Sequence, residues 1–156
     1  MDADKQTLKI ISGGQSGADR AGLDWAIQRG FEHGGWCPKG RRSEDGGIPE
    51  KYHLQETASS GYQERTERNI VNSDCTIIFS WNPVSAGTRM TVDFCWDHQK
   101  PFIVIDYKDA NKAIVEVRNF VDTHCPKVIN IAGNRESVSP GIYAFVRNVL
   151  EGAISG

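Results

Sequence analysis

The sequence predicts a three-layer α/β fold, a doubly wound sheet of five or six mainly parallel strands covered by helices on both faces. Three observations support this prediction. Short apolar runs alternate with amphipathic segments, which is the pattern of βαβ units. The apolar runs are continuous rather than alternating, as in strands buried on both faces. Several runs end in glycine-rich loops, where such sheets bind ligands.

The predicted strands follow one another along the chain. Residues 75–80, Cys-Thr-Ile-Ile-Phe-Ser, form an apolar run of the length of one buried strand. Residues 52–56 are much less hydrophobic, which favours a strand at the edge of the sheet. The complete set of expected strands is 8–12, 34–37, 52–56, 75–80, 102–106 and 128–131.

Amphipathic segments between these strands predict helices. The first helix covers residues 19–29 and ends at Gly30, a typical C-terminal stop. Ser139-Pro140 predicts the start of the last helix, with an N-cap followed by a proline in the first turn. The other expected helices cover 62–72, 88–98 and a segment with one face made of Ile114, Val117 and Val121. The last helix has Ile142, Phe145, Val146, Val149 and Leu150 on its core face.

Length and composition limit the possible functions. The 156 residues suit one domain, residues 1–156, and the net charge of −2 favours neither nucleic acid nor an anionic membrane as a partner. The apolar runs are far shorter than the about 20 residues that span a bilayer. Met1 to Lys5 are polar and lack the apolar stretch of a signal peptide. We therefore expect a cytoplasmic protein, with Cys75 and Cys95 as thiols of the core.

The first glycine-rich loop joins a predicted strand to a predicted helix. Glycines allow a ligand to approach the backbone closely, and free amides at a helix N-terminus favour an anion. The motif is neither a Walker loop nor the Gly-x-Gly-x-x-Gly fingerprint of NAD enzymes, so hydride transfer is not favoured. A tight turn without a ligand is the alternative. The candidate phosphate-binding residues are Gly13, Gly14, Gln15, Ser16, Gly17 and Arg20.

A second loop of the same kind follows the strand at residues 75–80. Its amides and hydroxyls would lie at another helix N-terminus, with an arginine beside them. A plain helix N-cap is the alternative. We expect this strand to lie beside the first strand, so that both loops line one crevice. The candidate binding residues are Ser85, Gly87, Thr88 and Arg89.

Charged residues elsewhere form weaker candidates. The loop at residues 36–49 is rich in glycine and charge, which is typical of a ligand loop or of a solvated turn. Lys39 and Arg41 would contact the ligand, and Glu44 and Asp45 would act in acid–base chemistry or bind Mg²⁺. Arg65 and Asn69 would reach the crevice or the solvent from the next helix. The histidines are scattered, and no protein-ligated metal is expected.

With these loops in view, the chain resembles the putative molybdenum carrier family. This family belongs to the Rossmann-like superfamily that includes the lysine-decarboxylase-like phosphoribohydrolases. The resemblance implies a Rossmann-like sheet in the order 3-2-1-4-5-6, a carrier of the molybdenum cofactor (molybdopterin) and a homo-oligomer, either a dimer or a tetramer. The matching stretches are residues 11–20, 35–41, 44–46, 48–49, Tyr52, 56–57, 65–69 and 73–74.

The comparison with the phosphoribohydrolases extends to single residues. Their Arg-Lys pair is matched here by Arg65 and Thr66, and their Gly-Thr by Gly87-Thr88. Thr91 stands at the position of their catalytic glutamate, and the nearest acid further on is Asp93. The phosphate-binding part of the motif is thus retained, while the catalytic carboxylate is not.

These observations favour a binding or carrier protein for a phosphate-bearing small molecule, either the molybdenum cofactor or a nucleotide. The first alternative is an enzyme that hydrolyses the N-glycosidic bond of nucleoside monophosphates, with Asp93 or Glu44 replacing the missing glutamate. The second is a subunit that acts mainly through protein interactions, for which the four tryptophans are the single positive sign.

Overall fold

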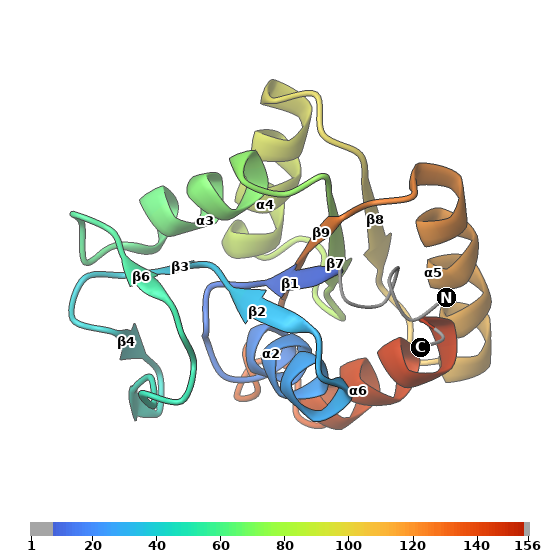
Figure 1. The fold of residues 1–156 in the computed structure, drawn as a ribbon, viewed down its shortest axis with the longest axis horizontal. Coiled ribbons are helices and arrows are strands. Elements are labelled where there is room, and N and C mark those ends of the chain that lie inside the picture. Colours follow the sequence, from blue (N-terminus) through green and yellow to red (C-terminus); the bar gives the residue numbers. More distant parts are fainter. Residues whose placement is uncertain (1–7, 155–156) are drawn as a thin grey trace.

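A five-stranded parallel sheet forms the centre of the molecule in the computed structural model, which describes residues 8–154 (Figure 1). All neighbouring strands in it are parallel, and their order is β2-β1-β9-β7-β8. The polar start at Met1 to Lys5 lies outside the described residues. The strands are β1 (Lys9–Ile11), β2 (Glu32–Gly34), β7 (Cys75–Phe79), β8 (Phe102–Ile105) and β9 (Val128–Gly133).

Helices cover both faces of this sheet. On one face α6 packs against both α2 and α5, and on the other face α3 packs against α4 (Figure 1). The predicted three-layer, Rossmann-like α/β class is therefore confirmed. The helices are α2 (Ala18–Arg29), α3 (Tyr62–Val71), α4 (Ala86–Asp97), α5 (Ala110–His124) and α6 (Ile142–Ala153). Two small sheets lie outside the central one, β3 (Trp36–Cys37) with β6 (Gln55–Glu56) and β4 (Arg42–Ser43) with β5 (Gly46–Gly47).

The position of β9 differs from the prediction. The expected order placed the last strand at an edge and β7 beside β1. Instead, β9 lies between them, and Ile129 pairs with Ile10 on one side and with Cys75 on the other. Ile129 and Ile131 are fully buried. An apolar run indicates burial but does not identify its neighbours, so the pattern could not place this strand.

The strand predicted over residues 34–37 is broken at Gly35. This residue has φ +124°, and a Cβ there would overlap the carbonyl oxygen of Ser12. A backbone in this conformation turns away from the sheet, so β2 ends at Gly34 and β3 begins a separate pairing. The strand predicted at 52–56 is likewise reduced to β6, the parallel partner of β3.

The last helix begins later than predicted. Its N-cap is Gly141, with φ +95°, and Ser139-Pro140 lie in the turn before it. The Ser139 hydroxyl donates to Asn134 Oδ1 at 2.8 Å, so it stabilises the turn after β9 instead of capping α6. The core face of α6 was predicted correctly at Ile142, Val146, Val149 and Leu150, all of which are fully buried.

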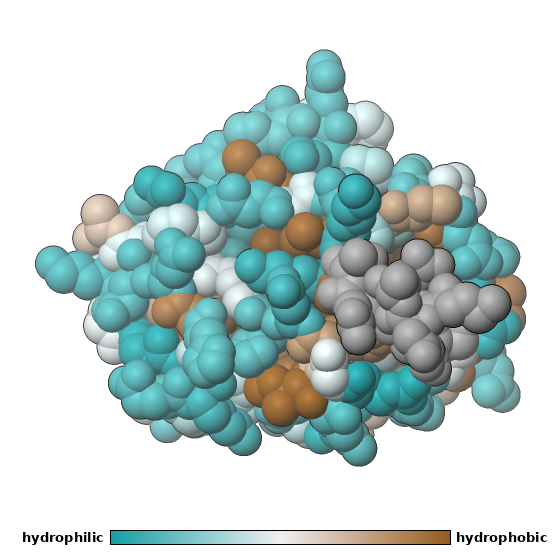
Figure 2. Space-filling model, in the orientation of Figure 1, coloured by the Kyte–Doolittle hydropathy of each residue, from teal (hydrophilic) through white to brown (hydrophobic). Residues whose placement is uncertain are grey.

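The nature of the surface and the burial of two cysteines agree with what the composition predicted. Polar side chains dominate the face drawn in Figure 2, with small, separate apolar areas between them. Among the described residues, no helix combines the length and the apolar character needed to cross a bilayer. Cys75 and Cys95 are fully buried, which confirms them as core thiols, and burial raises the pKa of Cys75 to about 12.

Candidate functional site

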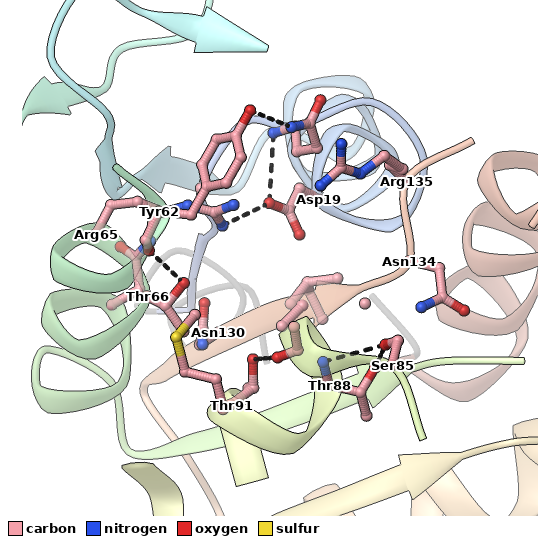
Figure 3. A pocket seen from close by; sticks show the side chains of 18 of the residues that line it. Asp19, Tyr62, Arg65, Thr66, Ser85, Thr88, Thr91, Asn130, Asn134 and Arg135 are labelled. Atoms are coloured by element: carbon pink, nitrogen blue, oxygen red, sulfur yellow. Dashed lines mark hydrogen bonds and ion pairs between the residues drawn. The ribbon is translucent and has the colours of Figure 1, made fainter. Parts of the chain in front are cut away.

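A pocket of about 470 Å³ opens at the carboxyl ends of the central strands (Figure 3). Its walls are the loop from β1 to α2, one side of α3, the first turns of α4, and β9 with the turn that follows it. Parallel α/β sheets bind their ligands at this edge, and the volume suits a small molecule. Both predicted glycine loops therefore line one crevice, although β9 separates the strands that carry them.

The first glycine loop uses its own amides internally. The amide of Gln15 donates to Asp19 Oδ2 at 3.3 Å, that of Gly14 to Ser12 Oγ at 3.3 Å, and that of Ala18 to the Asn134 carbonyl at 3.1 Å. The amides of Gly14, Gln15 and Ala18 are therefore not free for a ligand, contrary to the expectation for this loop. The Asp19 carboxylate occupies the position that we expected a ligand phosphate to take.

Asp19 and Arg65 form a buried ion pair beside this loop. Arg65 Nη1 lies 3.2 Å from Asp19 Oδ2, and the two side chains are 15% and 4% exposed. Burial raises the pKa of Asp19 above its ordinary value, although the Arg65 charge acts in the opposite direction. Gly13 leaves room for the guanidinium, because a Cβ there would overlap it. The positive charge of Arg65 is thus already paired.

Three arginines surround the ring of Tyr62 at the edge of the pocket. The guanidinium carbons of Arg42, Arg65 and Arg135 lie 4.8, 5.0 and 5.7 Å from the ring centre. Burial alone would raise the pKa of Tyr62. Hydrogen bonds from Arg42 and Gln15 and the nearby positive charges outweigh that effect, so its pKa lies below the usual value. In the described part of the chain, Arg135 forms no ion pair within 4.0 Å.

The N-terminus of α4 supplies donors on another wall. Ser85 is the N-cap, and its Oγ accepts the Thr88 amide at 3.3 Å. Ala86 and Gly87 line the pocket, and their amides donate to no acceptor among the described residues. Together with the helix dipole, they favour an anion at this point.

The turn after β9 completes this donor side. Asn134 Oδ1 accepts the Asn82 amide at 3.2 Å and the Ser139 hydroxyl at 2.8 Å, which leaves Nδ2 as the donor for the pocket. Arg135 follows directly and also lines the pocket. Figure 3 draws Ser85, Asn134 and Arg135 on one side of the cavity. Neither residue of this turn was predicted to belong to the site, because the expected strand order placed β9 at an edge.

The comparisons with known proteins agree with this architecture. The crystal structure of a protein described as a putative molybdenum carrier, from Syntrophus aciditrophicus SB, is 40% identical, with a TM-score of 0.91. The match covers 99% of this chain and 100% of that one. The model of the circularly permutated YpsA SLOG family matches residues 10–154.

The chain belongs to this family.

The predicted membership of the putative molybdenum carrier family is thereby confirmed. No curated protein matches the chain.

Circular permutation in the SLOG family accounts for the strand order. When β9 is counted as the first strand, the sheet β2-β1-β9-β7-β8 has the order 3-2-1-4-5. The spatial arrangement is then that of the expected Rossmann-like sheet, and the position where the chain begins differs. The turn after β9 accordingly occupies the place that we had expected for the first glycine loop.

The structure brings together only part of the predicted site. The predicted residues that line the pocket are Gly13, Gln15, Arg65, Asn69, Ser85, Gly87 and Thr88. Those that do not line it are Gly14, Ser16, Gly17, Arg20, Lys39, Arg41, Arg89, Glu44, Asp45 and Asp93. Asn69 lines the wall, but both ends of its amide are bonded to the backbone of Trp36.

Contacts within the protein explain why the charged loop stays outside the pocket. Arg41 donates to the carbonyls of Pro49 and Tyr52 at 2.7 and 2.8 Å and so closes its own loop. Arg20 pairs with Asp45 at 2.6 Å, and this hydrogen bond lowers the pKa of Asp45 to about 2. Glu44 accepts hydrogen bonds from the hydroxyls of Ser16 and Ser137.

Three further charged residues predicted for the site are exposed and lie outside the pocket, namely Lys39, Arg89 and Asp93. Arg89 and Asp93 belong to α4 but do not reach the cavity that its first turn lines.

The pocket offers little for acid–base catalysis. Asp19 is the one carboxylate among the described residues that line it, and it is paired with Arg65. Thr91 and Thr66, at the positions of the phosphoribohydrolase glutamate and lysine, both line the wall. Each donates its hydroxyl proton to a helix carbonyl, Thr91 to Gly87 at 2.9 Å and Thr66 to Tyr62 at 2.8 Å.

Proposed function

We propose that the chain is a binding or carrier protein for a phosphate-bearing small molecule, either the molybdenum cofactor or a nucleotide. One observation carries this proposal: on one side of the pocket lie Arg135, the amides of a helix N-terminus and an asparagine Nδ2, and within residues 8–154 the arginine has no ion-pair partner and these amides have no hydrogen-bond partner. This donor set suits a phosphate ester. In the molybdenum cofactor it would hold the terminal phosphate, and the pterin dithiolene would hold the metal.

The related crystal structure supports the molybdenum cofactor as one candidate, since that protein is described as a putative molybdenum carrier. The pocket supports both candidates equally, because a phosphate end is common to them. A cytoplasmic location and a homo-oligomeric state stay predictions. Gel filtration with light scattering would measure the oligomeric state.

The decisive experiment identifies what the protein retains. Purified protein is analysed by native mass spectrometry, and by elemental analysis for molybdenum. We expect a phosphate-bearing small molecule in stoichiometric amount. Ligand-free protein is then titrated with inorganic phosphate and ribose 5-phosphate by calorimetry.

A matched pair of variants locates the binding. Arg135→Ala is expected to weaken binding of ribose 5-phosphate by about 10- to 100-fold, the effect of losing a charge-assisted hydrogen bond. Arg89→Ala removes the same charge from an exposed position outside the pocket and is expected to leave the affinity unchanged. Equal effects of both variants would contradict a phosphate site at Arg135.

Hydrolysis of nucleoside monophosphates is the second candidate, because Arg65 lines the pocket as the phosphoribohydrolase motif requires. The exposed Asp93 and Glu44 do not line the pocket, so they offer no replacement for the missing glutamate. We expect no release of free base from a panel of nucleoside monophosphates. Turnover that is lost in Arg65→Ala would establish the enzymatic alternative instead.

A further inference from the structure

Two threonines in the pocket wall have no proton left for a ligand. Thr66 Oγ1 donates to the Tyr62 carbonyl at 2.8 Å, and Thr91 Oγ1 donates to the Gly87 carbonyl at 2.9 Å. A hydroxyl has a single proton and two lone pairs. Both side chains line the pocket, so what they present to a ligand is a hydrogen-bond acceptor.

Asn130 adds a third acceptor. Its Nδ2 donates to Thr76 Oγ1 at 3.3 Å, and this bond fixes the orientation of the amide. Asn130 lines the pocket, and its Oδ1 accepts no hydrogen bond from the described residues. The carboxamide oxygen is therefore available to a ligand donor.

The acceptors and the donors lie on different sides of the cavity. Figure 3 draws Thr66, Thr91 and Asn130 together, and Ser85, Asn134 and Arg135 on the other side. The pairing of α3 with α4 brings the two threonines to one wall. A ligand whose phosphate contacts the donor side would thus direct its far end towards the acceptors.

We propose that the acceptor side recognises a ring edge made of hydrogen-bond donors. The ligand class is then a phosphomonoester that contains a 2-amino-4-oxopyrimidine ring, because guanine and pterin share this ring with its adjacent N–H and amino group. This inference rests on the proposed function, because it takes the phosphate contact as given. An adenine ring presents a ring-nitrogen acceptor beside its amino group. This nitrogen would face a threonine or asparagine oxygen, which is also an acceptor, so no hydrogen bond could form and adenine would bind more weakly.

The ligand panel tests the ring preference. Ligand-free protein is titrated by calorimetry with guanosine, inosine and adenosine 5′-monophosphates and with ribose 5-phosphate. Inosine monophosphate lacks only the 2-amino group, so it is expected to bind about tenfold more weakly than the guanosine ester, the effect of one hydrogen bond. Equal affinity for the two would overturn the inference.

Variants assign the preference to the threonines. Thr91→Val keeps the shape of the side chain and removes the acceptor, whereas Thr91→Ser keeps the hydroxyl. We expect Thr91→Val to abolish most of the roughly tenfold preference for the guanosine ester, and Thr91→Ser to retain it. Binding of ribose 5-phosphate should be unchanged in both, which also shows that they are folded. Thr66→Val is measured in the same way. The inference would be overturned if both the Thr91→Val and the Thr66→Val protein kept the full preference.

The two proposals fail in distinguishable ways. If no phosphate ester binds, or if Arg135→Ala has no effect, the proposed function is wrong and this inference fails with it. If ribose 5-phosphate binds and the ring identity makes no difference, only this inference fails. Neopterin monophosphate in the same titration distinguishes the sources, since tighter binding than the guanosine ester assigns a pterin and weaker binding a nucleotide.

Discussion

At the scale of single residues, Tyr62 offers a spectroscopic measure of the charge in the pocket. Of the four tyrosines in the chain, Tyr52, Tyr107 and Tyr143 have a raised pKa, because burial and neighbouring carboxylates disfavour the phenolate. Tyr62 alone has a pKa below 10.0, since its hydrogen bonds and the positive charges of Arg42 and Arg135 outweigh its burial. It should therefore ionise first.

We expect an alkaline titration, followed by the ultraviolet absorbance of phenolate, to show one tyrosine ionising below pH 10.0. Between the lowered pKa of Tyr62 in the folded protein and its ordinary value of 10.0, the unfolded chain holds more protons than the folded protein. Tyr62 therefore adds to the stability as the pH rises through this range. Tyr62→Phe removes the early step, and Arg42→Ala moves it upwards. A saturating phosphate ester would also raise this pKa, because it offsets the charge of Arg135. An early step that persists in Tyr62→Phe would contradict the assignment.

The sequence predicted those residues of the pocket wall whose position depends only on the nearby helix. Ser85 caps a helix and Arg65 lies on the pocket side of another, both of which follow from spacing along the chain. Asn134 and Arg135 could not be recognised, because their importance depends on β9 lying in the centre of the sheet. The amide of Gln15 in the first loop was misjudged for a different reason. Whether Asp19 turns back towards Gln15 is a contact that no pattern of residue types specifies.

At the scale of elements, the N-cap of α4 links stability to binding. Ser85 Oγ accepts the Thr88 amide, and the same turn holds the amides of Ala86 and Gly87 at the pocket. Ser85→Ala is expected to cost about 1 kcal/mol in the free energy of unfolding, measured in urea. It should also weaken binding of ribose 5-phosphate, because the first turn of the helix is held less firmly.

Asp109 provides the matched control for this prediction. It caps α5, and its carboxylate accepts the Lys112 amide at 3.1 Å. Asp109→Ala should lower the stability by a similar amount, about 1 kcal/mol, without changing the affinity, because α5 does not line the pocket. If the two variants weaken binding equally, the effect comes from overall stability and the specific role of the α4 cap is refuted.

Elements with continuous apolar runs were predicted almost to the residue, as at β7, because burial on both faces leaves a clear pattern. The short strands were not. Gly35 ends β2 through a backbone conformation and a close approach to Ser12, neither of which hydrophobicity reports. The start of α6 was placed too early for a similar reason, since the Ser139 hydroxyl donates to Asn134 instead of capping the helix.

At the scale of the whole molecule, the strand order shows that the arrangement of the strands in space does not depend on where the chain begins. Helix α6 follows β9 and runs back towards the end of the sheet at which the parallel strands, β1 among them, begin. This is the course of the helix in any βα unit of a parallel sheet. An unpermuted relative would join these two elements and open the chain before β9. The pocket needs the three central loops in place, but it does not need the connection between α5 and β9.

A permuted chain tests this argument. It begins at Pro126, ends at Cys125 and uses residues 155–156 and 1–7 as the linker between the former ends. We expect it to fold and to bind ribose 5-phosphate as the original chain does, because loop closure varies slowly with loop length and Asp74 still accepts the Lys127 and Val128 amides at 2.9 Å. A second permuted chain, opened between Gly14 and Gln15, interrupts the loop that surrounds Asp19 and should lose the site. Circular dichroism and calorimetry compare the two, and failure of the first chain to fold would show that the α5–β9 connection is itself essential to the sheet.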